Sequence, residues 1–353
     1  MKNNSARGDR RLSHKLAIAL LIVIALNLAT GCVSAQSATG EITVHFIDVG
    51  QADSALIICE GATMLIDGGN AADSSLIYAY LQDHGITHLN YIVATHAHED
   101  HVGGLAGALN YATVDIALCP VTEYDSRAFN SFVKYLDEQG VSITVPAHGD
   151  TFMLGGAEVL IVGPVNQSDS PNNTSIVMKI TYGEISFLFT GDAERVEEME
   201  ILDAGYDVSA TVLKVGHHGS NTSSSYQWIY YVNPRYAVVS CGRNNPYGHP
   251  HEEVMSRLRD ADIETYRTDM QGHIVCMSDG RSVSFSTEKN ADVQTNPTAH
   301  IAAGEIYYIG NVNSKKFHKI SCSGLPAEHN RVSLDSREAA IGAGYEPCGI
   351  CRP

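Results

Sequence analysis

One short string constrains this chain more than any other part of its sequence. Thr95-His96-Ala97-His98-Glu99-Asp100-His101 follows an apolar segment and places four candidate metal ligands within six residues. Side chains alternate along an extended segment, so His96 and His98 point the same way and can reach one ion. Asp100 and His101 begin a helix and face a second ion. Imidazole and carboxylate suit zinc, and also manganese or iron. The alternative is a set of loop histidines with no shared task, but the full spacing after a hydrophobic strand is much rarer than a lone pair of histidines.

Strand-length apolar segments alternate with helix-length segments around this string. Strands are expected at 41–48, 53–60, 62–66, 89–95, 157–163, 175–181, 184–190, 209–215, 236–240, 272–277 and 281–286. Helices are expected at 71–83, about 100–110, 193–204 and 250–260, and a further strand-helix unit at 113–139. Strand-helix units mixed with hairpins predict an α/β fold in which mixed sheets have helices packed outside.

The string at 95–101 resembles the signature of the metallo-β-lactamase superfamily. Three further motifs, one before the string and two after it, occur in the order that this superfamily shows. Asp67 in Asp-Gly-Gly matches the early family aspartate, which supports the metal loop. Asp192 in Phe-Thr-Gly-Asp matches the carboxylate that bridges both ions, and 216–220 (GHHGS) matches the late histidine motif. The resemblance implies an αββα sandwich over residues 40–286, with two ions at one edge of the two sheets.

The sequence also resembles, more closely, the hydrolase domain of the ComEC competence proteins and its soluble relatives. The matching strings are 46–53 (FIDVGQAD), 172–175 (NNTS), 217–220 (HHGS) and 245–250 (NPYGHP). They cover residues 43 to about 285 in the expected order. The channel-forming segments of full ComEC proteins do not occur here, so we do not expect this chain to transport DNA itself.

The sequence departs from the superfamily pattern at one metal ligand. The first ion normally takes a third histidine, which these relatives place just before the strand that contains Ser175. Asn172 and Asn173 occupy that place here, and both are kept as candidate ligands. An amide oxygen is a weaker zinc ligand than imidazole, so the first site is predicted to be looser or tuned to a harder ion such as manganese. His148, the one histidine between the two motifs, is expected to lie in a surface turn.

The adjacent His217 and His218 cannot both point at one ion. His218 is the preferred ligand of the second metal, and His217 is then free to protonate a leaving group or to contact substrate. His249 is expected at the cleft rim, or else as a solvated loop histidine. Asp100, His217 and His249 are therefore the candidate catalytic residues. Lys214, at the end of a buried strand, either contacts a phosphate or caps the strand.

Two ions in such a site, ~3.5–4 Å apart, lower the pKa of bound water from 15.7 to about 7 and supply a hydroxide nucleophile. Electrophilic phosphorus and carbonyl carbon are both within reach of this chemistry. The formal charge of −17 repels polyanions at long range, which argues against a tight, nonspecific duplex binder.

Residues 287–304 lack apolar periodicity and are expected to be a linker to a small module at 305–353. His318, Cys322, Cys348 and Cys351 form an HxxxC…CxxC set, whose spacing suits a closed structural zinc site. So small a module has little core, and a metal would stabilise it. A pair of disulfides is the alternative in an exported chain. The module resembles the metal domain of the DNA-repair protein Ada, which also occurs as a tail on secreted nucleases.

Residues 1–35 read as an export signal. A basic segment at 1–15 precedes the apolar run 16–30, which is short for a membrane span of ~20 residues. Small residues before Cys32 resemble a bacterial lipobox, in which this cysteine is lipidated. Cleavage after Ala35, or a twin-arginine signal at Arg10-Arg11, are the alternatives. Each places the mature protein outside the cytoplasm, either anchored by lipid to the outer face of the membrane or secreted. No protein partner is predicted.

Together these features predict an exported two-metal hydrolase with two zinc or manganese ions and one further structural zinc. A phosphodiester substrate, with DNA first, follows from the ComEC-like strings and the Ada-like module, although the second is analogy only. The alternatives are hydrolysis of a phosphocholine ester, a lactone or a β-lactam, and a non-catalytic surface protein that binds nucleic acid.

Overall fold

The structure is a computed structural model, and it describes residues 40–297, 308–320, 322–334 and 336–353. The chain divides into two units, of which the first ends at Asn296 and the second begins at Pro297. This division falls inside the stretch predicted as a linker. The predicted export signal and Cys32 lie outside the described residues. Within the described residues, no helix combines the length and the apolar character needed to cross a membrane.

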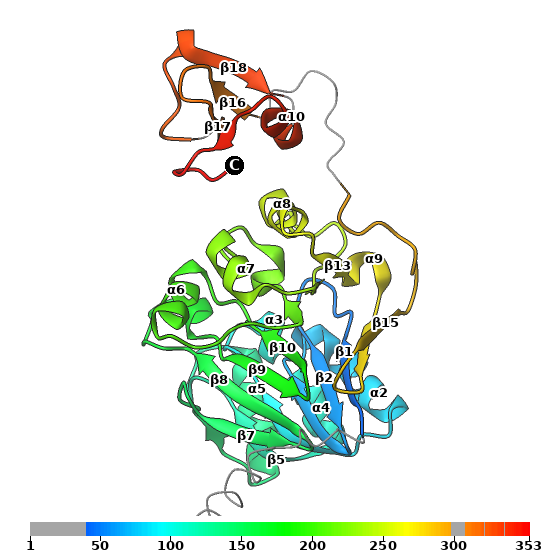
Figure 1. The fold of residues 1–353 in the computed structure, drawn as a ribbon. Helices are drawn as coiled ribbons and strands as arrows, with labels where there is room; N and C mark the ends of the chain where they lie inside the picture. Colours follow the sequence, from blue (N-terminus) through cyan, green and yellow to red (C-terminus); the bar gives the residue numbers. More distant parts are fainter. Residues whose placement is uncertain (1–39, 298–307, 321, 335) are drawn as a thin grey trace, which may run out of the picture. The chain divides into compact units, whose positions relative to one another are not determined.

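The first unit contains two mixed β-sheets (Figure 1). In the described residues one sheet has eight strands, in the order β15-β14-β1-β2-β3-β4-β5-β6. Their bounds are Ile42–Phe46 (β1), Ala55–Cys59 (β2), Ala62–Ile66 (β3), His88–Val93 (β4), Thr113–Leu118 (β5), Ile143–Thr144 (β6), Ile274–Ser278 (β14) and Val283–Thr287 (β15).

The other sheet has seven strands among the described residues, in the order β13-β12-β11-β10-β9-β8-β7. Their bounds are Thr151–Leu154 (β7), Ala157–Gly163 (β8), Val177–Tyr182 (β9), Ile185–Phe189 (β10), Val212–Lys214 (β11), Tyr236–Val239 (β12) and Glu264–Arg267 (β13). Strands β6, β7 and β13 are not among the predicted strands. They are short, and β7 is half exposed, so they lack a long apolar run.

Helices cover the outer face of each sheet. The first sheet packs against α2 (Ser74–Asp83), α4 (Leu105–Tyr111) and α5 (Arg127–Glu138), with Phe132 fully buried between them. The second packs against α6 (Arg195–Asp203), α7 (Tyr226–Val232) and α8 (Glu252–Asp260) around Trp228. A third apolar layer lies between the sheets, where the rings of Phe46 and Phe189 stack with their centroids 5.9 Å apart. The order of helices, first sheet, second sheet and helices confirms the predicted αββα sandwich.

Strand direction brings the motif-bearing loops to one edge of the sandwich. β3, β4 and β5 run parallel in one sheet, and β10, β11, β12 and β13 run parallel in the other. Carboxyl ends of parallel strands lie at the same edge. The loops after β3, β4, β10 and β11 carry, in that order, the Asp-Gly-Gly turn, the 95–101 string, Asp192 and the histidine pair.

Close backbone packing explains the glycines that follow the 95–101 string. The expected helix at 100–110 is two short helices, α3 (Glu99–Val102) and α4, which meet at Gly103-Gly104. A Cβ on Gly104 would lie 1.9 Å from the carbonyl oxygen of Gly68, and one on Gly107 would lie 2.0 Å from that of Ser74. Only glycine permits this approach. It brings His101 beside the Asp67 turn, where Gly68 N donates to His101 O at 2.7 Å.

In its described residues, the second unit contains a small sheet in the order β18-β16-β17-β19 and the helix α10 (Arg337–Gly342). The strands are Tyr308–Asn311 (β16), Lys316–Lys319 (β17), Arg331–Leu334 (β18) and Glu346–Pro347 (β19). Its buried apolar cluster contains Phe317, Leu334, Ala340 and Tyr345. So small a core leaves the unit dependent on further stabilisation.

Candidate metal centre

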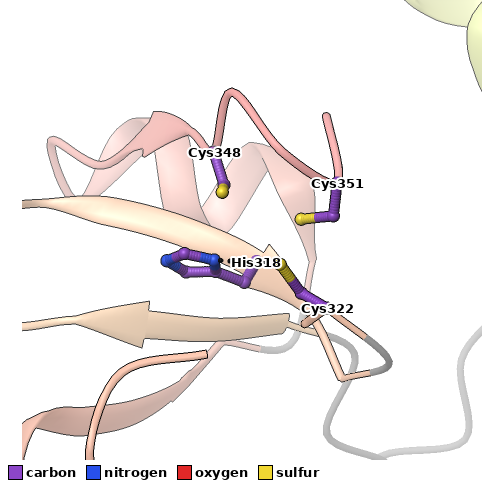
Figure 2. Close-up of side chains that lie close together, drawn as sticks. All are labelled: His318, Cys322, Cys348 and Cys351. Atoms are coloured by element: carbon purple, nitrogen blue, oxygen red, sulfur yellow. Dashed lines mark hydrogen bonds between the residues drawn. The ribbon is translucent and has the colours of Figure 1, made fainter. Parts of the chain in front are cut away.

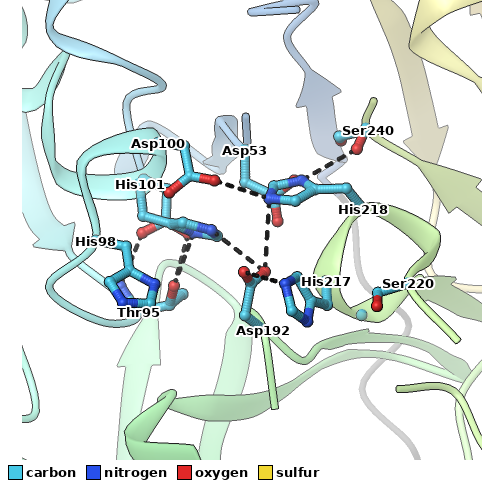
Figure 3. Close-up of polar contacts among 12 residues, drawn as sticks. Asp53, Thr95, His98, Asp100, His101, Asp192, His217, His218, Ser220 and Ser240 are labelled. Carbon is cyan, nitrogen blue, oxygen red and sulfur yellow. Dashed lines mark hydrogen bonds and ion pairs between the residues drawn. The ribbon is translucent and has the colours of Figure 1, made fainter. Parts of the chain in front are cut away.

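Asp192 lies at the centre of a cluster built from the strand-end loops (Figure 3). Its Oδ1 is 3.2 Å from His101 Nε2 and 3.7 Å from His218 Nε2. Its Oδ2 is 3.9 Å from His96 Nε2 and 3.5 Å from His217 Nε2. The two oxygens of one buried carboxylate therefore face two different groups of imidazoles.

The group on the Oδ1 side has the composition of a metal site. Asp100, His101, Asp192 and His218 each offer one ligand atom, and all of these atoms lie within 4.8 Å of one another. Asp100 Oδ2 is 3.2 Å from His218 Nε2. His101 Nε2 and Asp192 Oδ1 are buried and make no hydrogen bond. Buried polar atoms are normally satisfied, so these two fit a cation that both would bind.

The group on the Oδ2 side is more open. His96 is fully buried and its Nε2 lies 3.0 Å from His98 Nδ1, while His98 is half buried. His217 completes this side, with its side chain 21% exposed against 2% for His218. The sequence string thus brings its first two histidines together as predicted, and His217 joins them from the opposite sheet.

The two asparagines proposed in place of a third histidine behave differently from each other. Asn173 is buried, its Oδ1 accepts from Glu194 N at 3.0 Å and its Nδ2 donates to Glu194 Oε2 at 3.3 Å. Asn172 Oδ1 is buried and has no hydrogen-bond partner. Glu194 in turn lies 3.9 Å from His217 Nδ1. Asn173 therefore supports the segment behind His217.

Two carboxylates lie behind the imidazoles of the Oδ1 group. Asp67 Oδ2 contacts His101 Nδ1 at 2.8 Å, and its oxygens also accept from Thr95 N and Oγ1. Asp53 Oδ1 lies 3.1 Å from His218 Nδ1. A carboxylate behind a ligating imidazole fixes its tautomer and orientation. Asp67 was identified from the sequence for this supporting position, whereas Asp53 was not.

Lys214 forms a buried ion pair with Asp53, so its role is structural and it does not contact a phosphate. Its Nζ is buried, 2.8 Å from Asp53 Oδ2 and 3.0 Å from the carbonyl oxygen of Val215. It neutralises the second oxygen of Asp53 and leaves the first for His218. The sequence string 46–53 contained this aspartate, but nothing local marks a carboxylate whose partners are 161 and 165 residues away.

The charges in this cluster favour a cation. Burial lowers the pKa of His218, but Asp192 and Asp53 outweigh it and raise the pKa to about 10. Burial raises the pKa of Asp192, yet His101 and His218 hold that pKa well below its usual range. In His96, burial and the neighbouring His101 hold the pKa well below the usual value. The carboxylates thus remain ionised and His96 remains neutral, which are forms that bind metal, whereas His101 and His218 hold protons that a bound cation would displace.

The backbone of the histidine pair is unusual. His217 and His218 have φ values of 50° and 54°, a region that costs about 1–3 kcal/mol per non-glycine residue. The turn sets their ring planes 70° apart, with centroids separated by 6.1 Å. Asp100 and Asp53 contact His218, while Thr222 Oγ1 lies 3.2 Å from His217 Nδ1. The strained turn is what lets two adjacent histidines serve different sides of Asp192.

His249 lies beside this pair. Its ring centroid is 5.8 Å from that of His217 and 6.4 Å from that of His218. Gln51 Nε2 is 3.2 Å from its Nδ1. His148, by contrast, is exposed and contacts Tyr206, so it lies in a surface turn as expected.

Comparison with known proteins identifies the family. The family model described as the metallo-beta-lactamase superfamily matches residues 47–243. This chain belongs to the metallo-β-lactamase superfamily. Its fold is that of the metal-dependent hydrolases of this superfamily.

Several curated proteins are similar to this superfamily member. It is 30% identical over 269 residues to ComE operon protein 3 of Bacillus subtilis, covering 71% of this chain and 34% of that protein. It is 30% identical over 235 residues to Competence protein ComA of Neisseria gonorrhoeae (66% and 32%), and 31% identical over 239 residues to Recombination protein 2 of Haemophilus influenzae (65% and 28%). The chain spans about a third of the length of these curated relatives.

Beyond the part that matches the superfamily, the second unit holds another cluster (Figure 2). His318, Cys322, Cys348 and Cys351 place their ligand atoms within 4.8 Å of one another. The cysteines of the described residues are all free, so the three cysteines of this cluster are not bridged as disulfides. Backbone amides of Gly324, Ile350 and Lys319 donate to the three sulfurs, one to each, at 3.3–3.4 Å. Burial opposes the thiolate of Cys348, but amides from Cys351 and Ile350 lower its pKa overall.

Proposed function

We propose that this chain hydrolyses phosphodiesters, DNA first among them, with two divalent cations held on either side of Asp192. The observation that carries the proposal is the division of the Asp192 carboxylate, whose Oδ1 faces His101 and His218 and whose Oδ2 faces His96 and His217. A carboxylate shared between two ligand groups is the arrangement required to hold two metals close together.

The proposed ligands follow from the two groups. His96, His98 and Asp192 hold the first ion, and Asp100, His101, Asp192 and His218 hold the second. Asn172 stays a candidate for the first ion because its Oδ1 is buried without a hydrogen-bond partner. Asn173 could join only by giving up its contacts with Glu194. We propose zinc or manganese, since the second group mixes imidazole with carboxylate and the first lacks a third histidine ligand. When bound, such ions activate water and neutralise charge that develops on the substrate.

Two histidines outside the ligand set have proposed roles in the reaction. His217 is partly exposed, lies within 3.5 Å of Asp192 Oδ2 and is steadied by Thr222. It is placed to give a proton to the leaving oxygen. His249 stands next to His217 and is held by Gln51, so it is placed to contact substrate at the rim.

The proposed substrate rests on the relatives, one of which is named a competence protein and another a recombination protein. The net charge of −17 opposes long-range attraction of DNA. Binding must then depend on local groups near the centre. We further propose that the protein is exported and lipid-anchored at Cys32, as residues 1–35 suggest, so the substrate would be met outside the cytoplasm.

In the second unit we propose one structural zinc, held by His318, Cys322, Cys348 and Cys351. A closed set of three thiolates and one imidazole is typical of structural zinc. The amide donors to sulfur support it, because they stabilise thiolates that carry excess negative charge.

A substrate panel tests the proposed function. Purified protein with zinc or manganese is given single-stranded DNA, duplex DNA, bis-p-nitrophenyl phosphate, a phosphocholine ester and nitrocefin. We expect turnover of DNA and of bis-p-nitrophenyl phosphate. Asp192→Asn should lower kcat at least about a hundredfold, because it weakens both metal positions. The control is His148→Ala, which should keep full activity because His148 is exposed in a surface turn.

Metal analysis accompanies this panel. Turnover of nitrocefin alone would reject phosphodiesters as substrates. Absence of any turnover in protein that contains its full complement of metal would favour a non-catalytic role in binding nucleic acid.

A further inference from the structure

A cavity of about 750 Å³ opens next to the metal centre. It is lined by the loop 242–250, by residues 267–270 at the end of β13, and by residues 289–293 after β15. His249 belongs to its wall, and the ring of His249 also lies 5.8 Å from His217. The cavity and the proposed catalytic groups therefore share one side chain. Apart from His249, the residues that line it have no part in the proposed reaction.

The loop that forms most of the cavity wall is held in one conformation. Asn245 Nδ2 donates to Gly242 O at 2.9 Å, and Asn245 Oδ1 accepts from the amides of Tyr247 and His249. Gln51 ties the same loop to the first sheet, since its Oε1 accepts from Gly242 N and its Nε2 meets His249 Nδ1. A wall fixed in this way loses little conformational entropy when a ligand binds.

The cavity is locally basic although the chain is acidic overall. Arg267 is neutralised by a bidentate pair with Asp269 at 3.0 and 2.8 Å. Lys289 lies 3.7 Å from Asp48 and is half exposed. Arg243 is exposed, and among the described residues it has no acidic side chain within ion-pair distance. One guanidinium on the wall is thus left to bind an anion, which guanidinium does well with phosphate.

We infer that this cavity is a substrate subsite which binds the phosphate next to the scissile one in a nucleic acid strand, with Arg243 as the anchor. The inference rests on the proposed function, because it adds a second phosphate contact to a phosphodiester substrate. It also accounts for the binding of a polyanion by a protein whose net charge is negative. A single local cation beside the centre holds a polyanion that the rest of the acidic surface repels. Polymers with a second phosphate are then preferred over esters with only one.

Binding of a hydrolysis-resistant strand tests the inference apart from catalysis. The probe is fluorescein-labelled hexathymidylate with phosphorothioate linkages, titrated with metal-loaded protein and followed by fluorescence anisotropy over a range of salt concentrations. Arg243→Ala should raise Kd about fivefold to tenfold, the effect of one lost charge-assisted contact. It should also reduce the slope of log Kd against log salt by about 0.7, the value for one phosphate on a single strand.

Arg281→Ala is the matched control. Arg281 is an exposed arginine at the β14–β15 turn, whereas the cavity residue Lys289 follows the other end of that hairpin. It loses the same charge and should change Kd less than about twofold. Unchanged binding in Arg243→Ala, an equal loss in Arg281→Ala, or no binding by the unmodified protein would each overturn the subsite.

Turnover of bis-p-nitrophenyl phosphate by the unmodified protein separates this inference from the proposed function. Turnover without Arg243-dependent binding of hexathymidylate rejects the subsite and keeps the phosphodiesterase. Arg243-dependent binding without turnover of any phosphodiester keeps the subsite and rejects the phosphodiesterase.

Discussion

At the scale of single residues, Asp53 shows how a side chain behind the candidate ligands contributes to the candidate metal centre. Its carboxylate joins His218 to Lys214, and each of the three side chains is at least nine-tenths buried. Lys214 balances the charge of Asp53, so a buried carboxylate can orient an imidazole without leaving an unpaired charge. The role of Lys214 is therefore internal to the protein, and it is not a contact to phosphate.

Asp53→Asn should have two separable effects. Lys214 would lose its partner, so the free energy of unfolding should fall by about 3 kcal/mol. His218 would lose its orienting carboxylate, so metal affinity should fall about tenfold to a hundredfold. The double variant Asp53→Asn/Lys214→Met should recover most of the stability and none of the metal affinity. Urea unfolding and competitive metal titration measure the two quantities. A double variant that binds metal normally would show that Asp53 acts only as a counter-charge.

His45 predicts a pH dependence of stability that has nothing to do with the metal centre. Burial, with His84 and His273 nearby, lowers its pKa from 6.5 to about 4, and its Nδ1 meets Tyr80 Oη at 2.9 Å. Between these pH values the unfolded chain takes up a proton that the folded chain does not. The contribution of neutral His45 is therefore present above pH 6.5 and is lost as the pH falls towards 4.

The expected loss in the free energy of unfolding is about 2 kcal/mol. His45→Gln keeps a polar partner for Tyr80 and removes the titration. Urea unfolding from pH 4 to 7.5 should show the unmodified protein losing that much more stability than His45→Gln as the pH falls. Parallel profiles would mean that His45 does not titrate in this range.

At the scale of elements, the strained histidine turn depends on the segment that follows it. Glu198 on α6 accepts from the amides of Ser224 and Ser225, and Arg257 on α8 donates to the carbonyl oxygens of Ser223 and Ser224. Both side chains are buried. Two helices thus clamp the chain just after His218, which holds a backbone conformation that local preference alone would not keep.

The turn between β9 and β10 gives a prediction about how the two sheets join. Gly183 has φ +61°, and a Cβ there would lie 2.5 Å from the carbonyl oxygen of Gly280 in the β14–β15 turn. Gly183→Ala should therefore lower the free energy of unfolding by about 3 kcal/mol, from both the left-handed backbone and the clash. Gly140→Ala is the control, because Gly140 has φ +72° with nothing within 4 Å of a Cβ. It should cost only about 1 kcal/mol. Equal losses in urea unfolding would mean that the contact between turns does not matter.

At the scale of the whole molecule, the chain consists of two units that stabilise themselves by different means. In the part of the chain that the structure describes, the first unit buries three apolar layers, whereas the second has a single small cluster around Phe317. We propose that a metal bound by His318, Cys322, Cys348 and Cys351 takes the place of a larger core. Loss of metal should therefore affect the two units unequally.

Cys351→Ser should remove about one zinc per chain and leave the second unit sensitive to protease, because small metal-stabilised modules unfold when a ligand is lost. The hydrolase unit should keep its melting temperature and its turnover of bis-p-nitrophenyl phosphate. Ser323→Ala, an exposed neighbour of Cys322, is the control and should keep the full metal content. Mass spectrometry of bound metal with limited proteolysis checks this. Unchanged zinc content in Cys351→Ser would reject the structural site, and joint melting would reject the independence of the units.

The amino-acid sequence by itself predicted an α/β fold with mixed sheets and the candidate ligands in 95–101 and in the second unit, and its family resemblance implied the αββα arrangement and the remaining candidate ligands. Metal chemistry restricts ligands to a few residue types at short spacing, so the candidate ligands in 95–101 and 348–351 can be predicted without a structure. Asp67 and His249 were legible through the family resemblance. Short exposed strands such as β7 were not, because they carry no apolar period.

Only the tertiary structure decided how those residues are used. It placed His217 and His218 on opposite oxygens of Asp192, engaged Asn173 with Glu194, and revealed Asp53 and Lys214 behind the ligands. It also formed the cavity beside His249 from three segments distant in sequence. The physical reason is that side-chain partnership depends on where strands end in space, and the contacts of Asp53 span more than 160 residues. Spacing along the chain carries information only within a turn or a single strand.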